Sequence, residues 1–349
     1  MAVHAGGLAA QFVNVDDDEA MSIAATHFDL DGSVTRFATE KDDTFRLDNH
    51  DGSQYVLKIA NPGESVEELS FQTELLRHVA EVAPALPVPR AIADKTGQFF
   101  PLIQTKGGDW RHARVLSYMP GKPLASAGST PNGREKIGTL LGSLRHAMAT
   151  FSHPASSRTL AWDVRHFGSL RPLLEYVDNP VHRTQLDSAL RRFAAVESKL
   201  DNCRTQVVHN DFNTSNIVVN PESADFVTGV IDFGDAVRTA IAIDVSTALM
   251  NQFPANRDGA SEDFFNDASD LLRGYLMVAD LTFEELTLIP HLAMARVATR
   301  ALLTTWRAKL FPHNSAYILR NTEAGWGQLD WFVSRKPDEI SQLLHSFAH

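Results

Sequence analysis

Hydrophobic residues follow two different periods along this chain, and the change between them divides it into two parts. In the first part apolar and polar positions alternate in three short runs, as in half-buried strands. These runs are "SVTRFAT" (33–39), "DTFRL" (43–47) and "QYVLKIA" (54–60). The segment "DNHDGS" between the second and third contains Asp-Gly, which predicts a hairpin. From residue 131 onward helical spacing dominates, interrupted by short apolar strands within 207–219 and 227–233.

Helical patterns accompany the early strands. "DDDEAMSIAATHF" (16–28) places acidic residues where a helix begins, and this favours a solvated helix start over a metal site. "ESVEELSFQTELLRHVAEV" (64–82) has apolar residues at helical spacing. Two further strands are predicted in "PLIQT" (101–105) and "HARVLSYMPG" (112–121). The first third therefore reads as a leading helix, three strands, a helix and two strands.

Composition narrows the class of protein. The 349 residues are 44% hydrophobic and 21% charged, enough for a large core in one two-lobed domain or two domains. A formal charge of −11 argues against nucleic acid as a partner. The lone Cys203 suits a reducing compartment, and we see neither a signal peptide nor a run of 18 apolar residues. We therefore expect a cytoplasmic protein without a membrane partner; the oligomeric state is not indicated.

Two polar loops interrupt the helical part. "VVHNDFNTSNIVV" (207–219) sets polar residues between two buried strands, and "TGVIDFGDA" (228–236) is an apolar strand that ends at Asp232. If these strands pair as a hairpin-like unit, Asp211, Asn216 and Asp232 lie close together. Singly, each is typical of a turn. Together, their side-chain oxygens suit Mg²⁺, whose remaining ligands are often water and substrate phosphates.

The spacing His209-x-Asp211-x4-Asn216, followed by Ile231-Asp232-Phe233-Gly234, resembles the phosphotransfer signature of the aminoglycoside phosphotransferase and choline kinase superfamily. "YVLKIANP", "ARVLSYMPGKPL" and "GWGQLDWF" resemble its hydroxylysine kinase branch. The resemblance implies an α+β, protein-kinase-like bilobal fold. Residues 1–119 would form a strand-rich, nucleotide-binding N-lobe with a leading helix. Residues 120–349 would form a helical C-lobe that carries the catalytic and metal loops and the acceptor pocket.

The same resemblance implies roles for the polar residues. Asp211 would be catalytic, accepting a hydrogen bond from the hydroxyl group of the acceptor. Asn216 and Asp232 would hold Mg²⁺ against the nucleotide phosphates. His209 is expected to brace the loop rather than to transfer protons. Asp235 either anchors its loop or faces a cationic substrate.

The N-lobe is expected to bind ATP or GTP. Lys58 stands where the superfamily has its phosphate-binding lysine; otherwise it is an edge-strand lysine. A helical wheel favours Glu68 over Glu67 and Glu74 as its partner, although Gln72 is the most inward polar position. Backbone groups from Ser117 to Met119 would recognise the purine.

The loop expected over the phosphates, "ATEKDDTF" (38–45), departs from the glycine-rich loop of protein kinases. It contains no glycine, so backbone amides with Thr39 or Thr44 would cap the phosphates. The alternative is a simple hairpin turn.

An arginine stripe marks the candidate acceptor pocket. Arg296, Arg300 and Arg307 share one face of a predicted helix with apolar residues, and arginines in such a place need a carboxylate or phosphate partner. That partner is either an acidic loop of the protein or the carboxylate of an amino-acid substrate, with Arg296 as the clamp. Trp162 and Asp163 either line the pocket or form a core tryptophan with a helix-capping aspartate.

These patterns predict a kinase that transfers the γ-phosphate of ATP or GTP to a hydroxyl of an amine-bearing metabolite. A hydroxylated amino acid such as 5-hydroxylysine is the first choice, ahead of an amino alcohol or an aminoglycoside. A silent nucleotide-binding regulator is the alternative from another class, and the intact Asp211, Asn216 and Asp232 argue against it. A protein kinase is disfavoured because no Ala-Pro-Glu follows the Asp-Phe-Gly.

Overall fold

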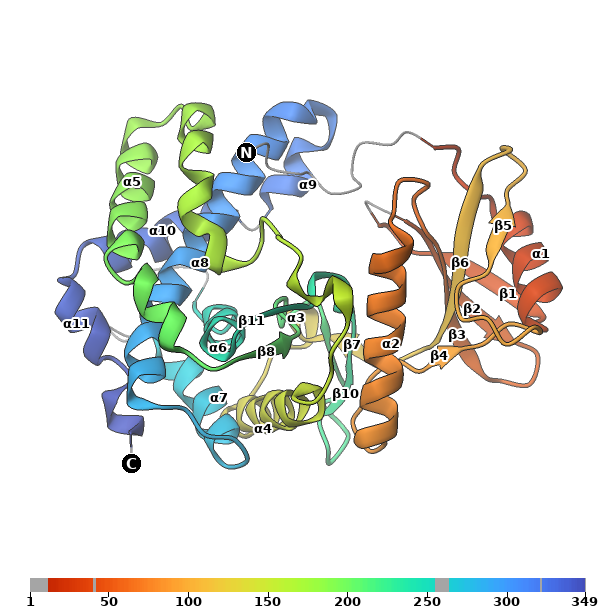
Figure 1. The fold of residues 1–349 in the computed structure, drawn as a ribbon, viewed down its shortest axis with the longest axis horizontal. Helices are drawn as coiled ribbons and strands as arrows, with labels where there is room; N and C mark the ends of the chain where they lie inside the picture. The colour runs from red at the N-terminus through yellow and green to blue at the C-terminus, as the bar shows by residue number, and fades with distance from the viewer. Residues whose placement is uncertain (1–11, 40–41, 255–263, 321, 349) are drawn as a thin grey trace.

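The computed structural model describes residues 12–39, 42–254, 264–320 and 322–348, and it has two parts: a strand-rich part on the right of Figure 1 and a helical part on the left. The strand-rich part contains an antiparallel sheet in the order β1-β2-β3-β6-β4, with β5 paired to β6. The elements of this part are α1 (Asp17–Phe28), β1 (Gly32–Arg36), β2 (Asp43–Asn49), β3 (Gln54–Ile59), α2 (Val66–Val82), β4 (Ala91–Ile92), β5 (Leu102–Gln104) and β6 (Trp110–Ser117).

The local signals in the sequence place these elements correctly. Asp16 caps α1 by accepting a hydrogen bond of 2.7 Å from the amide of Glu19, as the acidic run predicted. The Asp-Gly turn joins β2 to β3, and Gly52 adopts a φ of +87°, which favours glycine. The alternating apolar residues of β2, β3 and β6 bury one face of the sheet together with α1. This core includes Phe45, Leu47, Leu57, Ile59 and Val115.

Helix α2 packs toward the helical part of the protein. The helical spacing of apolar residues predicted one buried face of this helix, and this is confirmed, since Leu69, Gln72, Leu76 and Val79 are buried. However, its apolar residues Phe71, Leu75, Leu76 and Val79 belong to the core of the helical part rather than to the core of the sheet. Figure 1 shows α2 between the sheet and the helices of the helical part, with α1 on the opposite side of the sheet. This helix therefore connects the two parts.

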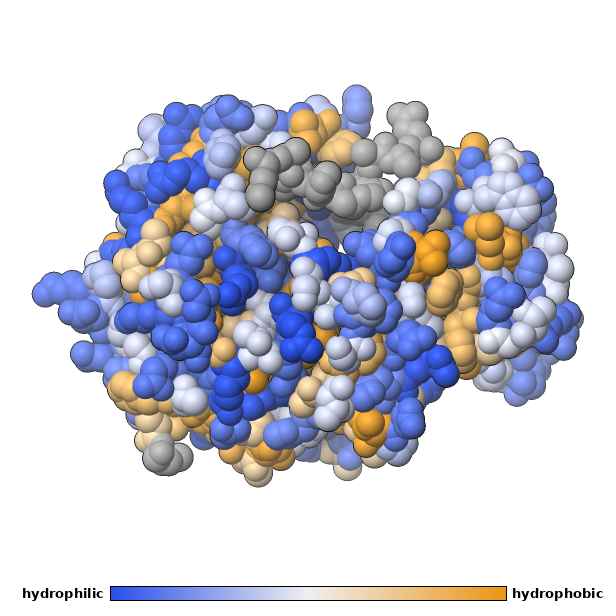
Figure 2. All heavy atoms as spheres, viewed as in Figure 1, coloured by the Kyte–Doolittle hydropathy of each residue, from blue (hydrophilic) through white to orange (hydrophobic). Residues whose placement is uncertain are grey.

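Helix α8 is the central element of the helical part. A capping box formed by Thr282 and Glu285 begins it, and 19 of its 28 residues are buried. It is long and apolar enough to cross a membrane, but 89% of its most apolar window is buried inside the protein, as expected of a core helix. On the face shown in Figure 2, hydrophilic residues predominate and hydrophobic ones are scattered.

The helices of this part are α3 (Leu124–Ala127), α4 (Pro131–Met148), η1 (Pro154–Ser157), η2 (Val164–Tyr176), α5 (Pro180–Ala194), η3 (Glu197–Asn202), η4 (Phe233–Asp235), α6 (Ile241–Met250), α7 (Asn266–Leu276), α8 (Phe283–Leu310), η5 (Pro312–Asn314), α9 (Ser315–Leu319), α10 (Thr322–Val333), α11 (Pro337–Gln342) and η6 (His345–Phe347). Of these, α6, η2 and α10 make the most extensive contacts with α8.

Two small sheets hold the polar loops. Their strands are β7 (Lys122–Pro123), β8 (Thr205–Val208), β9 (Ile217–Val219), β10 (Val227–Val230) and β11 (Val237–Ala240). β9 pairs with β10, with Ile217 opposite Val230, so the expected hairpin-like unit is present. β8 pairs instead with β11, a strand that the sequence pattern did not reveal. The loop after β8 therefore passes from one small sheet to the other, and both ends of it are fixed.

Candidate active site

Asp211 and Asn216 lie on the loop between β8 and β9 and are hydrogen-bonded to each other. Asn216 Nδ2 donates to Asp211 Oδ2 at 2.8 Å and to the backbone carbonyl of Asp211 at 3.0 Å. These bonds orient the amide of Asn216 so that its Oδ1 is left for another ligand. Burial raises the pKa of the Asp211 carboxyl, while Arg296 and nearby hydrogen-bond donors work in the opposite direction.

His209 joins this loop to the strand that precedes Asp232. The ring is fully buried, its Nδ1 accepts a hydrogen bond from the amide of Asp211 at 3.3 Å, and its Nε2 lies 3.1 Å from the carbonyl of Ile231. Because the carbonyl can only accept, Nε2 carries the proton. Burial also lowers the pKa of His209, which favours the neutral ring. These contacts agree with the bracing role expected for His209.

Asp232 and Asp235 lie on the short turn between β10 and β11. Asp232 adopts a φ of +63°, which is unusual for a residue other than glycine, and accepts a hydrogen bond of 3.2 Å from the amide of Gly234. Burial acts to raise the pKa of Asp232, but Lys58 and this amide outweigh it, so the pKa lies below its usual value.

The carboxyl group of Asp235 has a different environment. Burial, together with the charges of Asp211 and Asp232, raises the pKa of Asp235 to about 6. Asp235 therefore adds a third carboxyl group beside Asp211 and Asp232, and no hydrogen bond from a described residue anchors it.

Arg296 of α8 reaches this group of carboxylates. Its Nη2 lies 2.9 Å from Asp211 Oδ1, Nη1 donates to the carbonyl of Trp162, and the guanidinium lies 5.1 Å from the centre of the Trp162 ring. The carboxylate that Arg296 holds is thus that of Asp211, which is the internal ion pair considered above. Asp163 caps η2 through the amide of Arg165 at 3.0 Å, as its alternative reading predicted.

The N-lobe brings Lys58 to the same place, but its expected pair with Glu68 does not form. Lys58 Nζ lies 3.9 Å from Asp42 Oδ2, and its charge acts on Asp232. Glu68 forms an ion pair of 3.2 Å with Arg158 instead. The position of α2 is consistent with this difference, since its apolar residues pack against the helical part, which also supplies Arg158.

Arg158 is a residue that sequence reasoning missed. Besides Glu68, it contacts the turn that carries Asp232, because its Nη2 donates to the carbonyls of Gly234 and, at 2.9 Å, of Ala236. Asp244 was missed as well: its Oδ1 accepts a hydrogen bond of 2.7 Å from the amide of Asn210 and so fixes the loop that carries Asp211. Both partners are distant in the chain, and local patterns do not reveal them.

The other predicted nucleotide-binding residues lie at the end of β6. Ser117 exchanges two hydrogen bonds of 2.9 Å with the backbone of Arg90, one through its amide and one through Oγ. Met119 packs against Gly229, where an added Cβ would come within 2.7 Å of the Met119 Cβ. Gly121 follows with a φ of +140°, so only glycine is suited to this connection between the two parts.

The loop expected over the phosphates is described only in part, because residues 40–41 lie outside the described ranges. Thr39 Oγ1 donates to the carbonyl of Asp42 at 2.5 Å, which keeps it within its own turn. Thr44 lies directly opposite Lys58 in the β2–β3 ladder, and its buried Oγ1 has no hydrogen-bond partner. Thr44 is therefore the better placed of the two threonines.

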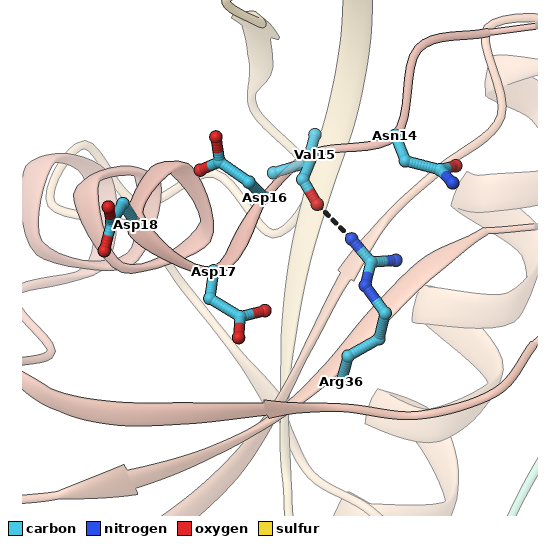
Figure 3. A pocket seen from close by; sticks show the side chains of 6 residues that line it. All are labelled: Asn14, Val15, Asp16, Asp17, Asp18 and Arg36. Atoms are coloured by element: carbon cyan, nitrogen blue, oxygen red, sulfur yellow. Dashed lines mark hydrogen bonds between the residues drawn. The ribbon is translucent and has the colours of Figure 1, made fainter.

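A hollow of about 560 Å³ lies at the start of α1, far along the chain from these residues. Figure 3 shows its acidic side chains, Asp16, Asp17 and Asp18, pointing in different directions, while Arg36 is hydrogen-bonded to the carbonyl of Val15. Asp16 is already used as a helix cap. This hollow does not have the features of a metal centre.

The residues around Asp211 fit a magnesium ion. Within the described ranges no group of three or more His, Cys, Asp or Glu side chains is arranged to hold a metal ion by itself. Asn216 Oδ1 and the ionised Asp232 offer two hard oxygen ligands, and Mg²⁺ commonly takes one or two protein ligands together with water and substrate phosphates.

Comparison with known proteins agrees with this geometry. The model of the phosphotransferase enzyme family matches residues 33–281. Hydroxylysine kinase of Mus musculus is 24% identical over 312 residues, covering 85% of this chain and 82% of that protein. Homoserine kinase of Sinorhizobium fredii is 28% identical over 304 residues, covering 84% of this chain and 85% of that protein. An amicoumacin kinase solved with AMP-PNP and Ca²⁺ has the same fold, with a TM-score of 0.68 at 19% identity over 90% of this chain and 94% of that chain. The expected kinase-like fold is confirmed.

Proposed function

This chain belongs to the phosphotransferase enzyme family as a small-molecule kinase, and we propose that it transfers the γ-phosphate of ATP or GTP to the hydroxyl group of an amino acid such as 5-hydroxylysine. The observation that carries the proposal is the meeting of Asp211, Asn216 and Asp232, with Lys58 acting on Asp232 from the other lobe.

Asp211 is proposed as the catalytic residue. Its Oδ1 is held by Arg296 and its Oδ2 by Asn216, so the carboxylate is fixed in orientation while its side chain stays 24% exposed. An oriented, accessible carboxylate is suited to accept a hydrogen bond from the acceptor hydroxyl and to align it for attack on the phosphate.

Asn216 and Asp232 are proposed to bind Mg²⁺, which would neutralise charge on the transferring phosphate. Lys58, with Thr44 beside it, would contact the nucleotide phosphates, and the backbone near Ser117 and Met119 would contact the purine. Glu68 would act on this site only indirectly, through Arg158 and the turn that holds Asp232.

The two curated relatives described above support an amino-acid acceptor, since both are named for hydroxylated amino acids. Asp235 supports an amine on the acceptor, because this third carboxyl group lies near Asp211 without an anchoring partner among the described residues. An amino alcohol or an aminoglycoside would also bring an amine, but neither brings a carboxylate. We place the enzyme in the cytoplasm, where Cys203 would stay reduced.

The test is phosphate transfer from ATP and from GTP to matched acceptors. We expect turnover with 5-hydroxylysine or homoserine, with a lower kcat/KM for the corresponding amino alcohols and for aminoglycosides. Loss of turnover in EDTA and recovery with added Mg²⁺ would support the metal role. Efficient turnover of amino alcohols with none of the amino acids would overturn the proposed acceptor class, and nucleotide binding without turnover of any acceptor would favour the silent regulator.

A further inference from the structure

Of two neighbouring arginines on α8, only Arg296 has an acidic partner among the described residues. Arg296 and Arg300 are four residues apart, so both side chains leave the same face of the helix. Arg296 pairs with Asp211 at 2.9 Å and also bonds to the carbonyl of Trp162. Arg300 has no ion pair with any residue that the structure describes. One positive charge beside the candidate active site is therefore not compensated.

The surroundings of Arg300 make this charge unfavourable. Its Nη2 donates to Gln328 Oε1 at 2.9 Å, which is a neutral acceptor, and its buried Nε has no hydrogen-bond partner. Burial and the nearby charge of Arg296 lower the pKa of Arg300 to about 10. A buried polar group without a partner is unfavourable, and more so when it is charged. An anionic ligand would remove this cost by supplying the missing partner.

We propose that Arg300, held by Gln328, binds the carboxylate of the acceptor, while Arg296 positions the catalytic Asp211. This inference rests on the proposed amino-acid kinase activity and moves the substrate clamp from Arg296 to the next turn of α8. The guanidinium nitrogens Nε and Nη1 donate to no described residue, while Nη2 donates to Gln328. Donors therefore remain for a carboxylate, with which a charged guanidinium forms strong hydrogen bonds.

The spacing along α8 limits the kind of acceptor. Four residues of α-helix rise by about 6 Å, so Arg300 leaves the helix about that far from Arg296 and the Asp211 that it holds. A hydroxyl close to the carboxylate, as in serine, does not span this separation. A hydroxyl carried further along an extended side chain does. The arrangement therefore favours γ- or δ-hydroxylated amino acids over β-hydroxylated ones.

The experiment compares Arg300→Gln with the wild-type enzyme on pairs of acceptors. Each pair is an amino acid and its decarboxylated amine: 5-hydroxylysine with its diamino alcohol, and homoserine with 3-aminopropanol. We expect the KM for the amino acids to rise about 10- to 100-fold in the variant, as after removal of a charged hydrogen bond. The KM for the amines, the kcat and the nucleotide affinity should change by less than about three-fold. Arg300→Lys, which keeps the charge without the fork, should give an intermediate KM.

Arg191→Gln is the matched control, because it removes an exposed arginine of α5 that is paired with Asp187, and it should not alter the preference for acid over amine. Equal changes of KM for acid and amine, or none for either, would overturn the role of Arg300 while leaving the amino-acid kinase in place. If the wild-type enzyme itself used only the amines, the proposed function would fail first. Should Arg300→Gln fold poorly, the acid-to-amine ratio of the Lys variant decides: a ratio equal to that of the wild type would overturn the proposal.

Discussion

The structural contacts of Asp211 orient the carboxylate to which we assign the proposed catalytic role. Each oxygen of its carboxylate has its own partner, Arg296 on Oδ1 and Asn216 on Oδ2. The amide of the same residue donates to the buried His209. The neighbours of Asp211 therefore fix the orientation of its side chain. A substitution that keeps the shape of this side chain tests the effect of its charge separately from the effect of its packing.

Replacing Asp211 with Asn keeps the size of the side chain but removes the charged acceptor for the substrate hydroxyl. We expect kcat to fall by about 10²–10⁴-fold with nucleotide affinity nearly unchanged, since the phosphates are bound elsewhere. Turnover assays with calorimetric titration of the nucleotide check this, and Asp225→Asn, on the exposed β9–β10 turn, serves as the control. A near-normal kcat would show that Asp211 is only structural.

Asn210, next to Asp211, is conformationally unusual. Its φ is +62°, its side chain is fully buried, and neither polar atom of its amide has a hydrogen-bond partner. Gly and Ala at this position remove the same polar atoms, but only Gly adopts this backbone conformation without strain. We expect the Gly variant to exceed the Ala variant by about 1 kcal/mol in free energy of unfolding, measured in denaturant. Equal stability would mean that the loop relaxes around the alanine.

At the scale of elements, α2 is linked through Arg158 to the turn that carries Asp232. Glu68→Gln removes the 3.2 Å ion pair with Arg158 and leaves α2 intact. Because the pair is partly exposed, we expect the Mg²⁺ concentration for half-maximal activity to rise by up to about five-fold, with an unchanged KM for the acceptor. Glu67→Gln, an exposed change on the same turn, should have no effect. A specific loss of nucleotide affinity in Glu68→Gln would instead support the expected ion pair between Glu68 and Lys58.

The turn before β2 presents a competitor for Lys58. Asp42 lies 3.9 Å from the lysine amine, where a phosphate would be expected to bind. Asp42→Asn removes this competing charge, so the dissociation constant of the nucleotide should fall by a few-fold in titration calorimetry, which is about the strength of a partly exposed ion pair. Asp51→Asn, at the β2–β3 turn, is the control. Weaker nucleotide binding would mean that Asp42 orients Lys58 for the phosphate.

The whole molecule shows which features sequence patterns reveal. Alternation and turn residues predicted the sheet of the N-lobe, because strands and hairpins depend on nearby residues. The oxygen-rich loops predicted the meeting of Asp211, Asn216 and Asp232. The partners of Lys58 and Glu68 were not predicted, because they depend on how α2 packs across the two lobes. The pairing of β8 with β11 and the contacts of Arg158 were not predicted either, because each joins segments that are far apart in the chain.

The stability of the whole molecule should depend on pH through His291, at the contact between α8 and α11. Its side chain is buried, Nε2 lies 2.9 Å from Ser341 Oγ, and Nδ1 has no partner. Burial, with smaller effects of Lys199 and Arg192, lowers the pKa of His291 from 6.5 to about 4. The unfolded chain therefore binds this proton first as the pH falls. The lowered pKa of His291 contributes to the free energy of unfolding in full above pH 6.5. This contribution, about 3 kcal/mol in all, is lost progressively as the pH falls to 4.

His291→Gln keeps a polar side chain of similar reach but cannot titrate in this range. We expect the free energy of unfolding of the wild type to fall more steeply than that of the variant between pH 6.5 and 4, while the difference between them stays constant above pH 7. Denaturant unfolding at a series of pH values measures both curves, and carboxyl groups that titrate in the same range cancel in the difference. Parallel curves would show that His291 takes up its proton in the folded protein as readily as in the unfolded chain, so that the contact between α8 and α11 opens without global unfolding.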